Sequence, residues 1–217
     1  MPCNCCEITD NAFSEEEARA QLRDYRKRGP ANQTKLILKA IRSLRLKDVE
    51  LLDIGGGIGA IHHELLKDVA RAATHVDASS AYLKDAKEEA ARRGHSDRVN
   101  FIHADFTDVA SELPKVDIVT LDRVVCCYPD FHKLLKAAAE HSRRALAFTY
   151  PRETWYMRLA LTVMNFFQSL RKDPFRVFLH PVAEMDSLLK GEGFERVSLH
   201  RLFVWEIALY QKRGGAA

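Results

Sequence analysis

The sequence predicts an α/β fold in which a mostly parallel sheet carries helices on both faces and ends in an antiparallel hairpin. Three observations support this expectation. Short apolar segments alternate with amphipathic helical segments through the first 150 residues. A glycine-rich turn, at 55–59, joins the first expected strand to the helix that follows it. Two extended segments, at 195–203 and 204–212, close the chain as a hairpin.

Composition limits the class of protein. A chain of 217 residues fits one domain, and the formal net charge of +3 does not point to nucleic acid or to a membrane. The first six residues lack the apolar core of a secretory signal. No apolar run reaches the ~18 residues of a spanning helix. We therefore expect a cytoplasmic protein with no nucleic-acid partner and no stable membrane insertion.

The glycine turn follows a strand expected at 49–54. Its residues Gly55, Gly57 and Ala60 also fit the fingerprint of dinucleotide-binding folds, which leaves an NAD-dependent oxidoreductase as an alternative. Asp53 stands two residues before the first glycine and completes the pattern Asp-x-Gly-x-Gly-x-Gly. A carboxylate at that position would repel a pyrophosphate and attract a cation, so the pattern favours a cationic ligand.

Acidic residues recur where the next strands end. The second strand, expected at 72–77, ends at Asp77, close to the ~20 residues after the glycine turn at which an acid binds ribose hydroxyls. The alternative for Asp77 is an ordinary cap of the next helix. The third strand, at 98–103, leads to Asp105, and the fourth, at 116–122, ends at Asp122. Ligands of open α/β sheets bind at these carboxyl ends.

This set of residues resembles the Class I S-adenosylmethionine-dependent methyltransferases, whose cofactor carries a sulfonium and an ammonium. The resemblance implies a Rossmann-like seven-stranded sheet and an enzyme that transfers a methyl group in line to an O or S atom of a small molecule. It implies ribose binding by Asp77, and adenine binding by Asp105 and Phe106. The full set of implied cofactor residues is Asp53, Gly55, Gly57, Gly59, Asp77, Ala78, Asp105, Phe106 and Asp122.

The same resemblance implies that residues 1–46 form a helical arm or lid over the cofactor cleft, ahead of a core at 47–217. Ser14 and Glu17 have the spacing of a capping box, so a helix should begin there and run to about Lys27. Gly29 and Pro30 end that helix, and a second amphipathic helix follows.

Within the superfamily, the residues after the fourth strand and the arm around Tyr25 look closest to the magnesium-protoporphyrin O-methyltransferases. That family places a catalytic histidine shortly after the fourth strand and a catalytic tyrosine on the arm. In this sequence Cys126 stands at the position of the histidine, and Tyr25 matches the tyrosine loosely. Tyr128, beside the expected acceptor, and His180 are further candidates for a catalytic role.

The five cysteines form two groups, Cys3, Cys5 and Cys6 near the start and Cys126 and Cys127 after the fourth strand. Their odd number argues against a disulfide framework, and their spacing is not that of a zinc finger, so no metal is expected. Thiolates bind soft species, which leaves open a methyltransferase for thiols or metalloids that uses the second group. Buried packing is the other interpretation of that pair.

The segment at 155–170 predicts a strongly apolar helix. Within an insert at about 153–172, this helix would cover the substrate cleft or form a contact between subunits of an oligomer. A short extended segment at 175–181 and a helix at 182–190 should connect it to the closing hairpin. A non-enzymatic alternative for the whole chain is a cofactor-binding accessory protein that has lost catalysis.

Overall fold

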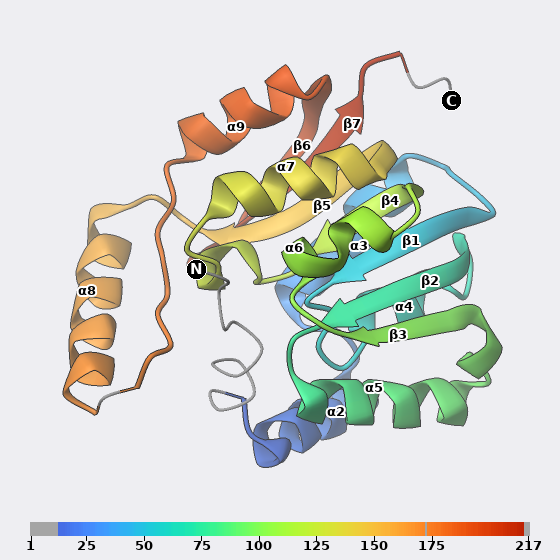
Figure 1. The fold of residues 1–217 in the computed structure, drawn as a ribbon, viewed down its shortest axis with the longest axis horizontal. Coiled ribbons are helices and arrows are strands. Elements are labelled where there is room, and N and C mark those ends of the chain that lie inside the picture. Colours follow the sequence, from blue (N-terminus) through green and yellow to red (C-terminus); the bar gives the residue numbers. More distant parts are fainter. Residues whose placement is uncertain (1–12, 172, 215–217) are drawn as a thin grey trace.

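The computed structural model describes residues 13–171 and 173–214, and its centre is one seven-stranded sheet (Figure 1). The strands are β1 (Val49–Ile54), β2 (Ala70–Asp77), β3 (Val99–His103), β4 (Val116–Leu121), β5 (Ser142–Pro151), β6 (Phe194–Arg201) and β7 (Trp205–Lys212). They lie in the order β3-β2-β1-β4-β5-β7-β6. The first five are parallel, and β7 is antiparallel to both β5 and β6. The predicted Rossmann-like sheet with an antiparallel C-terminal hairpin is therefore confirmed.

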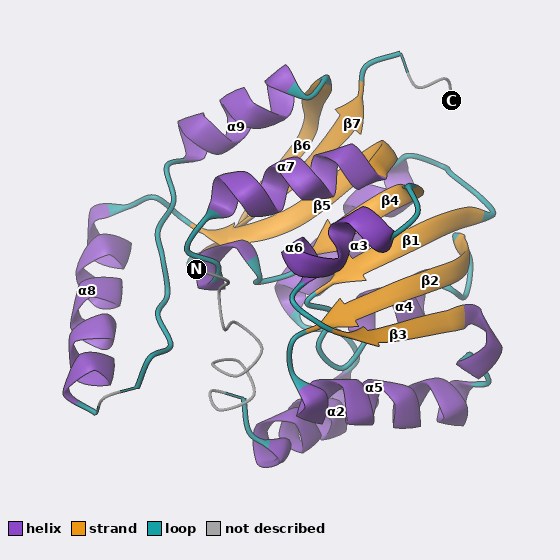
Figure 2. Cartoon of the chain, in the orientation of Figure 1, coloured by secondary structure: helices purple, strands orange, loops and turns teal. Residues whose placement is uncertain are grey.

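Helices lie on both faces of this sheet (Figure 2). The described helices are α2 (Glu15–Arg28), α3 (Asn32–Ser43), α4 (Ala60–Leu65), α5 (Ser80–Arg93), α6 (Phe106–Val109), α7 (Phe131–His141), α8 (Trp155–Leu170) and α9 (Val182–Gly191). Leu52 and Ile54 of β1 share one apolar core with α7 and α9, whereas Leu51 shares the opposite core with α3 and α4. Because side chains alternate along a strand, Asp53 points to the α3 and α4 face.

The predicted capping box begins α2. The Ser14 hydroxyl accepts a hydrogen bond from the Glu17 backbone N–H, and the Glu17 carboxylate accepts one from the Ser14 N–H. The helix ends at Gly29, which has a φ of 76°. Through Leu22 and Tyr25, α2 packs on Tyr82 of α5, so these two helices lie together beside the β3 edge of the sheet.

Most differences from the sequence-based expectations concern element boundaries. Helix α4 ends at Leu65 instead of near Asp68, because the next residues form a tight turn in which Asp68 donates to the Leu65 carbonyl. Strand β2 then begins at Ala70, earlier than expected, because its first residues pair with β1. The segment at 175–181 is a loop that joins no strand, and its Phe178 N–H donates to the Cys126 carbonyl over 2.7 Å.

Helix α8 has the bounds that the sequence predicts and stands away from the sheet (Figure 1). Its Met157 is buried, but Trp155, Leu159, Phe166 and Leu170 are more than half exposed. Within the described residues, none of the helices combines the length and hydropathy that crossing a bilayer requires.

Candidate active site

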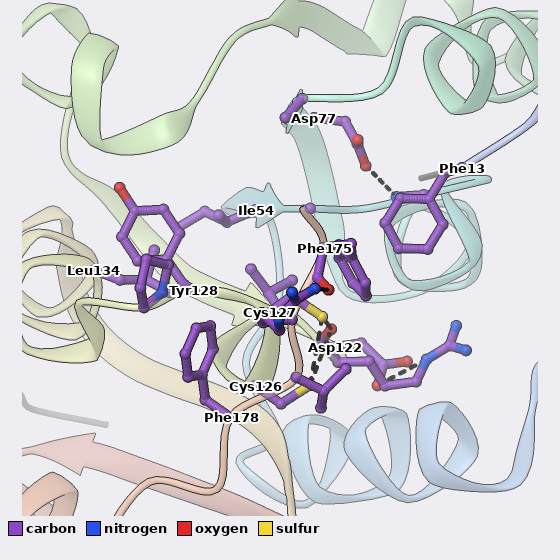
Figure 3. A pocket seen from close by; sticks show the side chains of 18 of the residues that line it. Phe13, Ile54, Asp77, Asp122, Cys126, Cys127, Tyr128, Leu134, Phe175 and Phe178 are labelled. Atoms are coloured by element: carbon purple, nitrogen blue, oxygen red, sulfur yellow. Dashed lines mark hydrogen bonds and ion pairs between the residues drawn. The ribbon is translucent and has the colours of Figure 1, made fainter. Parts of the chain in front are cut away.

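A cavity of about 540 Å³ opens at the carboxyl ends of β1, β2 and β4 (Figure 3). Open α/β sheets bind their ligands at this edge. Its lining includes seven of the residues predicted to bind the cofactor: Gly55, Gly57, Asp77, Ala78, Asp105, Phe106 and Asp122. The structure therefore brings together residues from four separate strand ends. Asp53 and Gly59 do not line this cavity.

Asp77 ends β2 and connects it to the glycine turn. Its carboxylate accepts a hydrogen bond from the Gly57 N–H over 2.8 Å and another from the Ser79 N–H over 2.8 Å. Burial raises the pKa of Asp77 to about 6, although both backbone hydrogen bonds act in the opposite direction. A carboxylate has about four acceptor positions, so this one can still accept hydrogen bonds from ligand hydroxyls.

Asp105 caps α6 and faces the same cavity. Its carboxylate accepts from the Thr107 N–H over 2.9 Å, and the Tyr128 hydroxyl lies 3.2 Å from its other oxygen. The neighbouring Phe106 ring is buried and lines the cavity as well. Burial, together with the charge of Asp105, raises the pKa of Tyr128 to about 12. The Tyr128 hydroxyl therefore keeps its proton at neutral pH and donates it in a hydrogen bond to the Asp105 carboxylate.

Asp122 lies directly after β4 and is held by two threonines that the sequence did not single out. Thr34 of α3 donates to its carboxylate over 2.5 Å, and Thr149 of β5 donates over 2.9 Å. The Thr149 hydroxyl also accepts from the backbone N–H of Arg123, which has a positive φ of 62°. Asp122 therefore connects the N-terminal arm to the sheet edge at the cavity wall.

A second hollow, of about 550 Å³, lies between the arm and the glycine turn. It shares Gly55, Gly57, Asp122 and Arg123 with the first cavity, so the two spaces adjoin at the turn. Asp53 contributes to the lining of this second hollow.

Tyr25 also lines the second hollow and does not line the first. Its hydroxyl donates to Glu64 over 2.9 Å, and the Arg93 guanidinium lies 4.7 Å from its ring. Burial, reinforced by the charge of Glu64, raises the pKa of Tyr25 well above its ordinary value. Tyr25 therefore lies on the arm side of the glycine turn, at the opposite side from the loop that contains Cys126.

Asp53 lies beneath the glycine turn, and Gly59 is the last residue of that turn. The Asp53 side chain is fully buried; it accepts from the Thr120 hydroxyl over 2.8 Å and lies 3.2 Å from Nδ1 of His62. Gly59 has a φ of +79°, and a Cβ there would lie 2.4 Å from Cε1 of His62. Glycine is thus required at residue 59 both by its backbone conformation and by the close approach of this ring.

A Gly59→Ala substitution tests that requirement. Alanine would add the strain of the left-handed conformation, about 1–2 kcal/mol, and would force the buried ring out of its position at a further ~1–3 kcal/mol. Gly94→Ala is the matched control, because Gly94 has a φ of +70° with open space around it. We expect urea unfolding to show a clearly larger loss for residue 59, and equal losses would contradict the packing explanation.

Cys126 and Cys127 lie on a short 3₁₀ turn (Val125–Cys127) and line the first cavity (Figure 3). Their sulfur atoms are 3.6 Å apart, and each lies within 3.7 Å of the Arg123 carbonyl. The contact between the two thiols lowers the pKa of Cys127 and raises the pKa of Cys126. Cys127 is therefore the thiol of this pair that ionises first. Cys3, Cys5 and Cys6 lie outside the described residues.

His180 supports this loop from outside the cavity. Its Nε2 lies 3.0 Å from the carbonyls of both Val125 and Tyr128, so this nitrogen carries the proton and donates to them. Its ring contacts those of Phe131 and Phe178, and burial lowers its pKa. The structure thus places His180 where it fixes the shape of the loop.

Beyond Cys127 the cavity continues into an apolar chamber. Met157, Leu161 and Met164 reach it from one side of α8, and the loop at 174–178 provides the facing wall. The predicted cover helix and the predicted extended segment both contribute to this chamber. The aromatic residues Phe175 and Phe178 of the loop were not singled out in the sequence, where their spacing gave only a weak alternation.

Comparisons with known proteins agree with this geometry. Residues 51–145 match the family model described as a methyltransferase domain. Magnesium protoporphyrin IX methyltransferase from Synechocystis PCC 6803, solved with bound SAH, superposes with a TM-score of 0.73 at 18% identity, covering 96% of this chain and 100% of that one. An O-methyltransferase family protein from Burkholderia thailandensis gives 0.71 at 13%, covering 94% and 64%. No curated protein matches the chain in sequence.

The matched stretch spans β1 through the beginning of β5 and includes the glycine turn and the acids at the strand ends. Over residues 51–145 the chain matches a methyltransferase domain, and its fold is that of the Class I S-adenosylmethionine-dependent methyltransferases. The comparisons favour S-adenosylmethionine over the NAD-dependent alternative left open by the glycine spacing, because magnesium protoporphyrin IX methyltransferase was solved with bound SAH and with bound SAM. The fold by itself does not set the reaction, since the [4+2]-cyclase SpnF superposes with a TM-score of 0.63 at 16% identity, covering 82% of this chain and 80% of that one.

The residues of the cavity fit this cofactor. Three carboxylates, those of Asp77, Asp105 and Asp122, line the cavity, and Arg123 and Arg176 are the basic side chains of its described lining. A ligand that carries a sulfonium and an ammonium matches this excess of negative groups. The backbone at Gly57 is also open to a ligand, because the nearest atom to a Cβ added there, in the Tyr82 ring, would be 3.7 Å away, an ordinary van der Waals distance.

Proposed function

We propose that this methyltransferase transfers a methyl group to an oxygen or sulfur atom of a small, largely apolar molecule. The single observation that supports this acceptor class is the continuity of the cavity, which runs from the glycine turn past Cys127 into the apolar chamber under α8. Cavities of about 300–1,000 Å³ with apolar walls and a few polar groups are typical of small-molecule sites.

In this proposal Asp77 binds the ribose hydroxyls of the cofactor, and Asp105 binds the adenine amino group beside the Phe106 ring. The methionine end extends along Gly55 and Gly57 toward Asp122, where the two hollows adjoin. The bound cofactor supplies an activated methyl group on its sulfonium. The protein then has to position the acceptor and exclude water from the chamber.

The arrangement of the candidate bases favours acceptors that ionise without help. The Tyr128 phenol is held at Asp105, the His180 Nε2–H is held by two carbonyls, and Tyr25 lies on the other side of the turn. A carboxylate or an acidic thiol needs no base, because it is already a nucleophile at neutral pH. We therefore infer that apolar carboxylic acids and thiols are preferred over alcohols and amines.

An acceptor panel tests this proposal. Purified protein is incubated with S-adenosylmethionine and one acceptor at a time, and S-adenosylhomocysteine is measured. Apolar carboxylates and thiols should stimulate its release above the rate without acceptor. Matched alcohols and amines of the same carbon skeleton serve as controls. Turnover confined to the amines, or to nucleic acid or protein, would contradict the proposed acceptor class.

The position of α8 supports two roles, a cover over the acceptor and a contact with another subunit, and one helix can have both. One side of the helix contributes Met157, Leu161 and Met164 to the chamber, so it would act as a cover over the acceptor. The outward side carries exposed Phe166 and Phe167, which fits a contact with another subunit. The N-terminal arm would act as a lid over the cofactor, because the Thr34 hydroxyl of the arm donates to Asp122 at the cavity wall.

A second candidate function is methylation of a soft nucleophile bound by the cysteine pair. The specific observation is the 3.6 Å separation of the two sulfur atoms at the cavity wall, beside the carbonyl of Arg123. Two neighbouring thiols of this kind can bind a soft species such as trivalent arsenic, and Cys127 is the thiol that ionises more readily.

Serine substitutions separate the two candidates. If the thiols bind the acceptor, Cys127→Ser should lower turnover of arsenite by about 100-fold or more, since one of its two sulfur ligands is lost. If the pair is only part of the wall, both Cys126→Ser and Cys127→Ser should keep the turnover of an apolar carboxylate within about threefold. Cofactor affinity, measured by calorimetry, serves as the control and should stay unchanged in both variants.

A further inference from the structure

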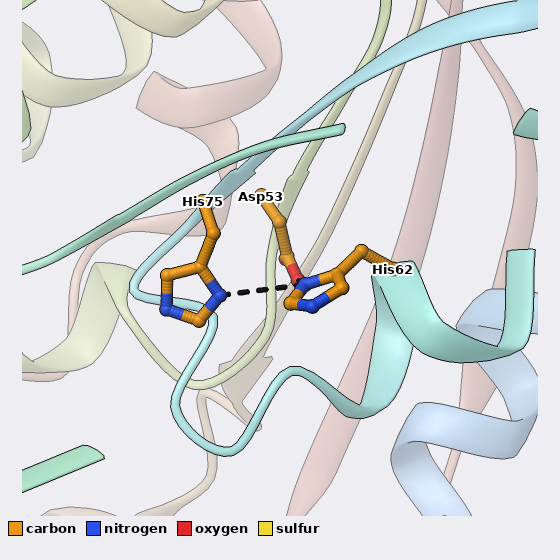
Figure 4. Close-up of side chains that lie close together, drawn as sticks. All are labelled: Asp53, His62 and His75. Carbon is orange, nitrogen blue, oxygen red and sulfur yellow. Dashed lines mark hydrogen bonds and ion pairs between the residues drawn. The ribbon is translucent and has the colours of Figure 1, made fainter. Parts of the chain in front are cut away.

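A cluster of buried polar side chains lies beneath the glycine turn, on the sheet face opposite α7 and α9 (Figure 4). The register of the parallel strands places Asp53 of β1 directly beside His75 of β2. His62 reaches the same point from α4, because the glycine turn and the first turn of that helix fold back over the strand end. All three side chains are fully buried.

The polar atoms of this cluster converge on one another. Nδ1 of His62 lies 3.2 Å from Oδ2 of Asp53 and 3.3 Å from Nδ1 of His75. One atom from each residue lies within 4.8 Å of the other two. Bonds of ~2.0–2.1 Å around a tetrahedral zinc ion place neighbouring ligand atoms about 3.3 Å apart, which matches the two shorter separations.

Hydrogen bonds alone leave this cluster incompletely satisfied. A carboxylate only accepts, so Nδ1 of His62 must carry the proton that faces Asp53. Nδ1 of His75 then faces the same N–H and can only share it as a second acceptor. Nδ1 of His75 therefore has no donor of its own in the cluster. Buried polar groups without a partner are rare in folded proteins and call for a physical reason.

The negative charge of the buried Asp53 carboxylate likewise has no permanently charged partner among the described side chains. The carboxylate is enclosed, and none of the described lysine or arginine side chains forms an ion pair with it. An isolated buried carboxylate is strongly unfavourable unless it takes up a proton or a cation compensates its charge. A divalent cation held by one carboxylate and two neutral imidazoles would supply that compensation.

We propose that Asp53, His62 and His75 bind a zinc ion beneath the glycine turn, separate from the cofactor cavity. Neutral imidazole and carboxylate are common zinc ligands, and three protein ligands leave one coordination position for water. Surrounding groups support the ligands in the usual manner. The Thr120 hydroxyl donates to the other oxygen of Asp53 over 2.8 Å and so orients that carboxylate.

The consequence concerns the shape of the turn. Gly56 and Gly59 lie directly above the ligands, since a Cβ at Gly56 would lie 2.8 Å from the His75 ring and one at Gly59 would lie 2.4 Å from the His62 ring. An ion at this place would fix the turn that forms the floor of the cofactor cavity. Asp53 would then act on the cofactor through the turn that it anchors. This role is independent of which acceptor the enzyme methylates.

The direct test is metal analysis of refolded protein. Because the cluster is enclosed, the protein is unfolded in guanidinium with a chelator and refolded with or without excess zinc. Zinc per chain is then measured by plasma mass spectrometry. A variant with all five cysteines changed to serine excludes binding by thiols. We expect about one zinc per chain in this variant, and a refolded chain without zinc would overturn the proposal.

Single substitutions locate the ion. His62→Leu and His75→Leu should each lower the zinc content about tenfold or more in the cysteine-free chain. His95→Leu is the matched control, since His95 is a neighbouring buried histidine that contacts His63 and not the three ligands. It should keep the zinc. Zinc retained in both ligand variants, or lost only in the control, would contradict the assignment.

Cobalt gives a measurement on the wild-type chain, so the result does not depend on whether any variant folds. Refolding with Co²⁺ should produce the visible bands of a four-coordinate nitrogen and oxygen site at one ion per chain. Any thiolate charge-transfer band from the five cysteines should disappear when the thiols are alkylated, while the bands of the nitrogen and oxygen site remain. Visible bands that are lost together with the thiolate bands, or no visible bands, would overturn the proposal.

Discussion

Replacing Asp77 by alanine is expected to weaken S-adenosylmethionine binding by about 10- to 100-fold. The carboxylate lines the cavity and is already oriented by the backbone N–H groups of Gly57 and Ser79. Charge-assisted hydrogen bonds to ligand hydroxyls contribute roughly 1.5–3 kcal/mol, and each 1.4 kcal/mol is tenfold in affinity. Calorimetric titration of S-adenosylhomocysteine into the purified variant measures the change directly.

Asp108→Ala is the matched control for this experiment. Asp108 is another aspartate near the cavity, but its side chain is exposed and does not contribute to the lining. Its removal should leave the affinity within about twofold. Binding of S-adenosylhomocysteine that is equally strong in the Asp77 variant and in wild type would refute the assignment of this residue to the ribose.

Replacing Glu89 by glutamine is expected to lower the free energy of unfolding by about 2–3 kcal/mol. The Glu89 side chain is fully buried in α5 and contacts three guanidinium groups, at 2.8 Å from Arg26, 2.6 Å from Arg92 and 2.5 Å from Arg93. Breaking a fully buried ion pair costs ~3–5 kcal/mol, and the partly exposed arginines reduce this figure. Because Arg26 belongs to α2, the loss should loosen the arm.

The neighbouring Glu88 provides the control. Among the described residues its ion pair is with Arg26, over 3.1 Å, and its side chain is about half exposed. Exposed pairs contribute ~0–1 kcal/mol, so Glu88→Gln should change stability little. Urea unfolding at neutral pH measures both variants. A loss for Glu89→Gln no larger than that for Glu88→Gln would show that the network does not stabilise the fold.

The pH dependence of this difference follows from the sign of the shift. Burial by itself would raise the pKa of Glu89, but the hydrogen bonds from Arg92, Arg93 and Arg26 outweigh it and hold the pKa well below the ordinary 4.5. A lowered folded-state pKa contributes stability above 4.5 that is lost as the pH falls toward the folded-state value. The difference between wild type and Glu89→Gln should therefore shrink in acid.

The sheet could be predicted because its signals are local. Strand β1, the glycine turn and α4 follow one another within 17 residues, from Val49 to Leu65, and each is specified by neighbouring residues. The acids at the strand ends could be placed as well, because parallel strands bring their carboxyl ends to one edge of the sheet. These two rules are enough to gather Asp77, Asp105 and Asp122 around one cavity.

The remaining features of the site depend on long-range packing, which spacing in the sequence does not report. Thr34 and Thr149 hold Asp122 from elements 115 residues apart in the chain. Whether His180 faces the cavity or the loop carbonyls depends on the path of the loop after α8. The cluster around Asp53 likewise needs the strand register that pairs it with His75, and nothing in the local sequence marks that histidine.

A crystal structure of the chain with S-adenosylhomocysteine tests the central claim most directly. We expect the ligand in the cavity at the ends of β1, β2 and β4, with its ribose hydroxyls on Asp77 and its adenine beside Asp105 and Phe106. Its sulfur should face the chamber that Cys127 and α8 line. A ligand bound elsewhere, or a cavity closed by the protein's own side chains when the ligand is present in excess, would contradict it.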